Sequence, residues 1–330
     1  MGFYKFFIIP LFLFSLLGCS EDEVDNSDSD SSTDDQTCTS GSLWFIGGEN
    51  TTETLNKVWK STDEGATWTE VGLIPGDRLH HSIVSFDSKL WVLGGNNGTG
   101  AKKSVWSSSD GDDWSVVGVL DEARQSGAAF SFNEKLWYIG GTHKDEDDIS
   151  VYEDQVWSSE DGVTWSESVY TLPLDLIYSS PVIFKEQMWL IGGSTADDTY
   201  TNSVLASEDG ETWTTMEELP LDSIGLAASV VFDDKIWVFG GWTGTEILDT
   251  IIVSDEDGLA WETKAETLPV PIEAAGVATD GCKIWLAGGM TTDGVDFSYI
   301  NAVFVSEDGV TWEQAGTIPE TAFAGTLILY

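Results

Sequence analysis

Short runs of alternating apolar side chains recur along the chain from residue 41 onward. In Lys89-Leu90-Trp91-Val92-Leu93, for example, aromatic and aliphatic side chains project to opposite faces of an extended strand. Because both faces of these runs are apolar, both must be covered by neighbouring sheets. The pattern therefore predicts an all-β protein in which sheets pack face to face.

Most of these runs end in a Gly-Gly pair, and a tryptophan stands three residues before the first glycine of every pair. The six tryptophans are Trp44, Trp91, Trp137, Trp189, Trp237 and Trp285. Successive pairs are 46 to 52 residues apart, a period typical of β-propeller blades. The repeats predict a six-bladed β-propeller whose four-stranded antiparallel blades pack radially.

A second motif, Ser-x-Asp-Gly-x-x-Trp, follows each pair after another predicted strand. Its six copies end at Trp68, Trp114, Trp165, Trp213, Trp261 and Trp312. Asp-Gly between strands predicts a tight hairpin, because glycine adopts the positive φ that the turn needs. In the first copy Asp63 stands two residues before Gly65, and in the other five we place the aspartate directly before the glycine.

These two motifs, with the Leu-Pro or Ile-Pro that follows them, resemble kelch repeats across residues 41–330. The first turn also resembles the Asp-box of sialidases, which in that family is a peripheral fold element. The tyrosine that precedes the last tryptophan of a kelch repeat is absent here. The resemblance implies a kelch-type propeller, with the first strand of each blade innermost and ligands bound where loops enter these strands.

The first repeat lacks the strand that precedes the Gly-Gly tryptophan in the other repeats, such as residues 80–86. Residues 324–330 align with this missing strand and have no repeat of their own. We predict that they pair in the N-terminal blade and close the ring. Cys38 and Cys282 then lie in neighbouring blades, where they form either a disulfide, which an exported protein permits, or two free thiols.

The N-terminal residues predict export. Residues 1–18 combine Lys5 with an apolar run that is shorter than a membrane span of ~20 residues, which is typical of a cleaved signal peptide. Leu16-Leu17-Gly18-Cys19 resembles the lipobox of bacterial lipoproteins, which implies a lipid on Cys19. Residues 19–37, rich in acids and serines, predict a disordered tether to a propeller of residues 38–330.

The acids after Cys19 resemble the export signal of Bacteroidetes surface lipoproteins. We therefore expect a protein of the bacterial outer membrane that faces the cell exterior and touches the membrane only through its lipid. The chain carries 57 acids against 14 basic residues, a formal net charge of −43. This charge excludes nucleic acid and polyanionic glycans as expected partners, and we expect a monomer.

The candidate ligand site lies where loops enter the inner strands. Eleven residues before the Gly-Gly tryptophans stand His80, Ser126, Tyr178, Leu226 and Ala274, and Ala324 fills the sixth place. The only two arginines, Arg78 and Arg124, precede the first two of these positions by two residues. We predict an off-centre site made of Arg78, His80, Arg124, Ser126 and Tyr178, with Trp242 as an aromatic platform in a nearby loop. The alternative is that these are loop-end residues that satisfy backbone groups.

Two known propeller activities are disfavoured by side-chain counts. Sialidases hold a carboxylate with three arginines, and galactose oxidase binds copper through two histidines and two tyrosines with a thioether to cysteine. Only His80, His81 and His143 are available, and Cys38 and Cys282 lie on the wrong strands.

We assign no catalytic residue, metal ligand or cofactor. The acidic loop at residues 143–154 could take Ca²⁺ or be a solvated insertion.

Two functional hypotheses remain open. The first is a non-catalytic surface module that binds a neutral or cationic glycan, peptide or protein through one face of the ring. The second is a carbohydrate-active enzyme such as a sialic acid mutarotase, in which Arg78, His80 and a nearby glutamate would transfer protons. The scarcity of histidine and arginine favours binding, although a fold alone does not define a function.

Overall fold

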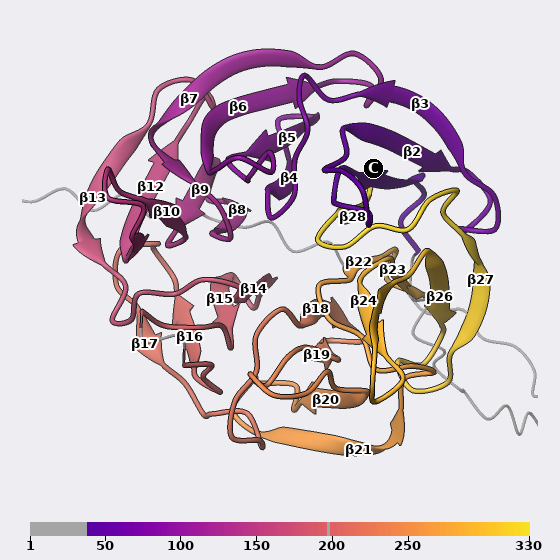
Figure 1. The fold of residues 1–330 in the computed structure, drawn as a ribbon. Coiled ribbons are helices and arrows are strands. Elements are labelled where there is room, and N and C mark those ends of the chain that lie inside the picture. Colours follow the sequence, from indigo (N-terminus) through magenta and orange to yellow (C-terminus); the bar gives the residue numbers. More distant parts are fainter. Residues whose placement is uncertain (1–37, 197–198) are drawn as a thin grey trace, which may run out of the picture. The chain divides into compact units, whose positions relative to one another are not determined.

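The computed structural model describes residues 38–196 and 199–330. In this part of the chain the regular elements are β-strands, and six four-stranded antiparallel sheets surround a common axis (Figure 1). The predicted six-bladed all-β propeller is confirmed. The predicted signal peptide, tether and lipid site at Cys19 lie outside the described residues. Within those residues, no helix has the length and apolar character needed to span a membrane.

Each blade runs from an inner strand at the axis to an outer strand at the rim. Blade 1 contains β28 (Thr326–Leu329), β1 (Leu43–Ile46), β2 (Lys57–Ser61) and β3 (Thr69–Leu73). Blade 2 contains β4 (Ser82–Phe86), β5 (Lys89–Leu93), β6 (Lys102–Ser108) and β7 (Ser115–Arg124). Blade 3 contains β8 (Ala128–Phe132), β9 (Lys135–Ile139), β12 (Gln155–Ser159) and β13 (Ser166–Thr171).

The other three blades follow the same order. Blade 4 contains β14 (Ser180–Phe184), β15 (Gln187–Ile191), β16 (Val204–Ser207) and β17 (Thr214–Thr215). Blade 5 contains β18 (Ala228–Phe232), β19 (Lys235–Phe239), β20 (Thr250–Ser254) and β21 (Trp261–Thr267). Blade 6 contains β22 (Gly276–Thr279), β23 (Ile284–Ala287), β26 (Ala302–Ser306) and β27 (Glu313–Thr317). Two hairpins add β10 (Thr142–Lys144) with β11 (Ser150–Tyr152), and β24 (Met290–Thr292) with β25 (Phe297–Tyr299).

The ring closes between blades 6 and 1. The C-terminal strand β28 pairs antiparallel with β1, with Trp44 opposite Ile328, which confirms that the C-terminal strand completes the N-terminal blade. Cys38 and Cys282 form a disulfide with their Cα atoms 5.3 Å apart, so the structure contains the first of the two alternatives left open for these cysteines. This bond joins the start of blade 1 to the turn before β23.

The Gly-Gly pairs connect each blade to the next. The first glycine of every pair has φ between 59° and 67°, and the second donates its N–H to a carbonyl in the segment that leads to the following blade, as Gly48 does to Arg78 at 2.7 Å. A Cβ on Gly240 would come within 2.1 Å of the Ile272 carbonyl oxygen. Glycine is therefore required both for the left-handed backbone and for the close approach of the neighbouring blade.

The Asp-box turns, as we call the six Ser-x-Asp-Gly-x-x-Trp hairpins, interlock adjacent blades. In blade 3, Ser159 Oγ accepts the Gly162 N–H at 2.8 Å, and Asp161 Oδ1 accepts the next two backbone N–H groups at 2.8 and 2.7 Å. These bonds lower the pKa of the Asp161 carboxyl. A Cβ on Gly162 would come within 2.0 Å of the Trp91 ring of blade 2. Each turn therefore packs its glycine against a neighbouring blade.

The turn in blade 5 differs from the prediction. Asp255, three residues before the glycine, accepts the Leu259 N–H at 2.8 Å, and Asp257 instead pairs with Lys185 at 2.5 Å. Asp63 in the first turn likewise accepts an N–H four residues on. Our assignment of the aspartate directly before the glycine was wrong for this copy, because the turn is one residue longer and the carboxylate that accepts its N–H group comes from Asp255.

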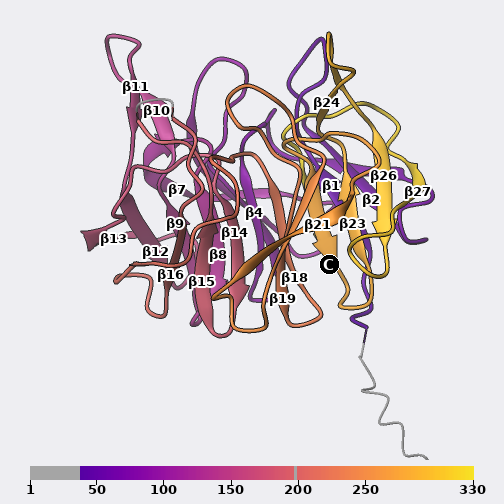
Figure 2. The same ribbon diagram turned by 90° about the horizontal axis from the view of Figure 1, so that it is seen from below.

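The two faces of the ring carry different structures. The Asp-box turns and the Cys38–Cys282 disulfide lie at one face, which we call the lower face. The Gly-Gly ends and the two added hairpins lie at the opposite, upper face (Figure 2). The loops that enter the inner strands belong to the upper face.

Candidate functional site

Six equivalent residues begin the inner strands at the upper face, one in each blade. These mouth positions are His80, Ser126, Tyr178, Leu226, Ala274 and Ala324. All six have φ between 49° and 61°, in the left-handed region, although none is glycine. Such a conformation costs about 1–3 kcal/mol for a residue with a side chain and is concentrated at functional sites.

Backbone hydrogen bonds pass from one mouth position to the next around the axis. Ser126 donates its N–H to the His80 carbonyl at 2.9 Å, and Tyr178 donates to Ser126 at 3.1 Å. Leu226 and Ala274 continue the series at 3.0 and 2.8 Å, and His80 donates to Ala324 at 3.3 Å. The series holds the left-handed backbone in place while leaving the side chains free to differ.

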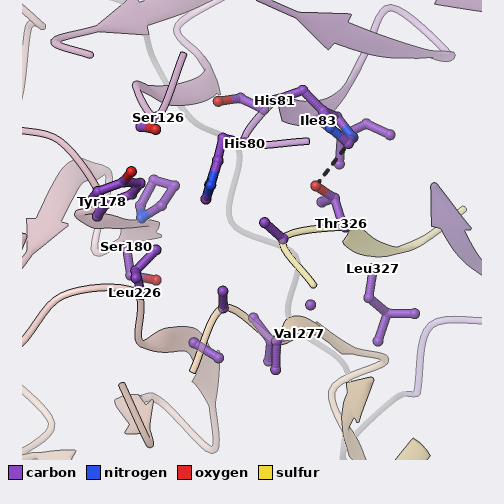
Figure 3. Close-up of a pocket in the computed structure, with 18 of the residues that line it drawn as sticks. His80, His81, Ile83, Ser126, Tyr178, Ser180, Leu226, Val277, Thr326 and Leu327 are labelled. Carbon is purple, nitrogen blue, oxygen red and sulfur yellow. Dashed lines mark hydrogen bonds between the residues drawn. The ribbon is translucent and has the colours of Figure 1, made fainter. Parts of the chain in front are cut away.

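The mouth positions surround an axial cavity of about 350 Å³ (Figure 3). Ligand pockets in proteins span about 300 to 1,000 Å³, so this cavity suits a small molecule or one group of a larger one. The third residue after each mouth position, further along the inner strand, also lines the cavity, and we call these six the floor residues: Ile83, Ala129, Pro181, Ser229, Val277 and Leu327. All but one of these floor residues are apolar.

The two halves of the mouth differ chemically. His80 and Tyr178 flank Ser126, and their ring centroids are 5.3 Å apart with the planes tilted by 56°. The opposite half presents only Leu226 and two alanines. Among the described residues, no Asp, Glu, Lys or Arg lines the cavity. The site is therefore uncharged in a strongly acidic protein.

Three polar atoms at the cavity lack a partner within the described residues. These are Ser126 Oγ, Ser229 Oγ and His81 Nδ1, each shielded from solvent. The other ring nitrogen of His81 lies 3.5 Å from Thr326 Oγ1. A buried polar group without a hydrogen bond costs about 1–3 kcal/mol, and a ligand hydroxyl or amide would recover this energy once the side chain turns its polar atom toward the cavity.

The two cavity histidines are neutral near pH 7. Burial lowers the pKa of His80 to about 4. Burial also lowers the pKa of His81 to about 3, with smaller contributions from the positive charges of Arg78 and His80. Each ring therefore carries one donor and one acceptor nitrogen and no positive charge.

Of the six sequence-predicted binding residues, the structure brings His80, Ser126 and Tyr178 together at the cavity. Trp242 stands outside it on the upper face, with its ring centroid 6.0 Å from that of Phe297 on β25. Trp242 therefore borders the site without lining it.

The two arginines are placed elsewhere, and this corrects their assignment to the site. Arg78 donates from Nη2 to Ser104 Oγ at 2.6 Å, and its guanidinium lies 4.1 Å from the Trp106 ring. Arg124 is 1% exposed and stacks 4.7 Å from the Trp157 ring. Arg78 turns into blade 2 and Arg124, at the end of β7, turns toward blade 3, because a tryptophan there offers each a cation–π contact.

Sequence reasoning missed His81, Ser229 and Thr326, which also line the cavity. Ser229 could have been found, because it is the one polar residue at a floor position that is apolar in the other five blades. Thr326 follows Ala324 by two residues on the predicted closing strand, so its place near the axis also followed from the predicted closure.

Two residues of the acidic loop and one residue of β7 form a group of possible metal ligands. The ligand atoms of Glu122, His143 and Glu153 lie within 4.8 Å of one another. Arg124 contacts both carboxylates, at 2.9 Å from Glu122 and 3.5 Å from Glu153, and so already supplies a positive charge. Asp145 Oδ1 accepts two backbone N–H groups of the hairpin turn, each at 2.9 Å. Calcium binding by this loop stays a prediction.

Comparison with known proteins supports the fold and defines a family. A solved protein described as "Structure of YjhT" superposes with a TM-score of 0.67 at 14% sequence identity, over 77% of this chain and 88% of that one. This likeness concerns the fold alone. No curated protein sequence matches the chain. The family described as the DUF6242 beta propeller domain matches residues 24–301, and the chain belongs to this family.

Proposed function

We propose that this protein is a non-catalytic binding module that holds a glycan, peptide or protein ligand at the axial cavity of its upper face. The carrying observation is the set of buried polar atoms at the cavity that have no partner within the described residues. The left-handed mouth backbone supports the proposal, because strained backbone concentrates at functional sites.

Binding is better supported than the enzymatic alternative. Proton transfer at an anomeric centre needs an acid and a base near the reacting carbon. Arg78, nominated for that role with His80, is buried in blade 2. No carboxylate among the described residues lines the cavity, and the pKa of His80 lies far below neutrality.

A plugged cavity tests this proposal. Tryptophan at Ala274 is compatible with the backbone, because Tyr178 and Leu226 carry large side chains at equivalent positions with similar φ. The full-length protein and its Ala274→Trp variant are screened by saturation-transfer NMR against monosaccharides and tripeptides. Val169→Trp, on the exposed rim strand β13, is the matched control.

We expect binders whose signal is lost with Ala274→Trp and kept with Val169→Trp. Signals that are equal in both variants would place the ligand elsewhere and contradict the proposal. Interconversion of α and β anomers of a bound sugar at catalytic amounts of protein would contradict the non-catalytic assignment.

We also propose that the module is a kelch-type propeller anchored to the outer membrane by a lipid on Cys19, facing the cell exterior. The repeated Gly-Gly and tryptophan positions support the kelch assignment. Cys38, where the described chain starts, lies at the lower face of the propeller, opposite the cavity mouth. A Cys19→Ala variant should leave the membrane fraction, and unchanged fractionation would contradict the anchor.

A further inference from the structure

The cavity restricts the charge of its ligand. Carboxylated ligands are normally held by arginine or lysine, which pair with the oxygens through charge-assisted hydrogen bonds. Neither residue type lines this cavity within the described part of the chain, and its histidines are neutral near pH 7. A carboxylate buried here would lose its hydration without gaining a counter-charge.

The net charge of the protein acts in the same direction. Of the 57 acids and 14 basic residues of the chain, eight acids and Lys5 precede Cys38, which leaves 49 acids, 13 basic residues and a net charge of −36 for the propeller. An anionic ligand would therefore approach a surface of like charge. Neutral ligands avoid both costs.

The walls and floor of the cavity also restrict the chemistry of the ligand. Ser126 at the mouth and Ser229 at a floor position carry hydroxyls without a partner among the described residues. The rest of the floor is apolar, and the rings of His80 and Tyr178 cover one side of the mouth. A sugar ring combines hydroxyls at its edge with apolar C–H faces, which matches this arrangement.

We propose that the cavity binds an uncharged monosaccharide residue and discriminates against its carboxylated counterparts. This inference rests on the proposed function and deepens it by naming the ligand class. Ser126 and Ser229 would turn their hydroxyls toward the cavity and bond the sugar hydroxyls, and the apolar floor residues would pack against the ring.

Matched pairs of sugars test the charge requirement. Glucose and glucuronic acid differ in the oxidation of one carbon, as do galactose and galacturonic acid. Each is titrated at pH 7 into the full-length protein and into Ala274→Trp by isothermal calorimetry. We expect at least one neutral member to bind about tenfold or more tightly than its acid, and Ala274→Trp to abolish this binding.

Serine variants test the assigned contacts. Ser126→Ala and Ser229→Ala should each weaken binding of the neutral sugar by about tenfold. They should leave the melting temperature of the ligand-free protein unchanged or raise it, because each removes a buried hydroxyl without a partner. Ser82→Ala is the contrast, since its hydroxyl donates to the Gly127 carbonyl at 2.7 Å and its loss should lower the melting temperature.

The outcomes separate the two proposals. We call binding plug-sensitive when Ala274→Trp abolishes it. Plug-sensitive binding of an acid that is tighter than binding of its neutral counterpart would overturn the neutral-ligand inference and leave the proposed binding function supported. Absence of plug-sensitive binding by every sugar in the pairs would overturn the inference, while a plug-sensitive tripeptide in the earlier screen would still support the function. Neutral binding that is indifferent to both serine variants would overturn the assigned contacts.

Discussion

The Asp-box turns of the lower face and the mouth positions of the upper face are both sets of six equivalent residues, and they differ in what is repeated. In the turns the side chains repeat, and serine, aspartate, glycine and tryptophan form nearly the same bonds in five of the six copies. At the mouth the backbone repeats, with φ between 49° and 61°, while the side chains range from alanine to tyrosine.

Under the proposed binding function, this difference separates the residues that stabilise the propeller from those that would contact a ligand. The turn glycines pack against tryptophans of adjacent blades, so their identity is fixed by contact. The mouth backbone is fixed by hydrogen bonds between main-chain groups, which accept any side chain that tolerates the left-handed region. Changes at the lower face should therefore cost stability, and changes at the mouth should alter binding.

The largest effect is expected from Gly162→Ala in the Asp-box turn of blade 3. Its Cβ would enter the Trp91 ring, and overpacking together with left-handed strain should lower the free energy of unfolding by about 3 kcal/mol. Gly294→Ala is the control, because Gly294 also has positive φ but has open space around it. Urea unfolding measures both, and equal losses would refute the interlocking role of the turn.

Loss of the disulfide at the lower face should lower the free energy of unfolding by nearly as much as Gly162→Ala does. Replacing Cys38 and Cys282 together by serine opens a crosslink between residues 244 apart and should lower the free energy of unfolding by about 2–4 kcal/mol. Reduced wild-type protein should unfold at the same urea concentration as the variant. Wild-type stability that is unaffected by reductant would contradict a role for this bond in closing the ring.

Replacing Glu273, next to the mouth position Ala274, should raise the free energy of unfolding, whereas the two changes above lower it. It is 4% exposed, and burial raises the pKa of its carboxyl to about 7. Because the folded state holds this proton more tightly, the contribution to stability is present below pH 4.5 and is lost as the pH rises through 7.

Glu273→Gln should therefore raise the free energy of unfolding above pH 7 by about 1–2 kcal/mol, with little change at pH 4. Urea unfolding at both pH values measures the difference, and the exposed Glu313→Gln provides the control. A gain of the same size at pH 4 would show that charge burial is not the cause. A higher free energy of unfolding for Glu273→Gln that is confined to high pH would sharpen the contrast between the two faces. It would show that the native protein is less stable than it could be because of a charge buried beside the mouth.

The smallest effect is expected at a mouth position itself. Ala274→Gly relieves left-handed strain at φ 50° but makes the unfolded chain more flexible, so the net gain should be at most about 1 kcal/mol. Thermal unfolding measures it. A loss larger than that of Gly162→Ala would mean that the mouth, rather than the turns, holds the ring together.

Much of the fold could be predicted because the repeat places its structural residues at fixed offsets. The Gly-Gly glycines and their tryptophans identified the blades, and the spare strand at residues 324–330 identified the closure. The turn in blade 5 was misplaced, because two aspartates stand near Gly258 and only the hydrogen bonds show which one accepts.

The site was predicted only in part. Counting back from the tryptophans located His80, Ser126 and Tyr178, because equivalent positions in a propeller converge on the axis. The same counting placed Arg78 beside them, but spacing along a strand does not show that its side chain turns toward Trp106. The left-handed backbone was also unforeseen, since neither tyrosine nor leucine indicates it.

The most direct test of this separation is calorimetric titration of a neutral sugar that binds wild-type protein into a triple variant, His80→Ala with Ser126→Ala and Tyr178→Ala. Alanine already occupies two mouth positions with similar φ, so the backbone should tolerate the change. We predict that binding falls at least a hundredfold while the melting temperature stays within a few degrees of wild type. Undiminished binding by a folded triple variant would contradict the account.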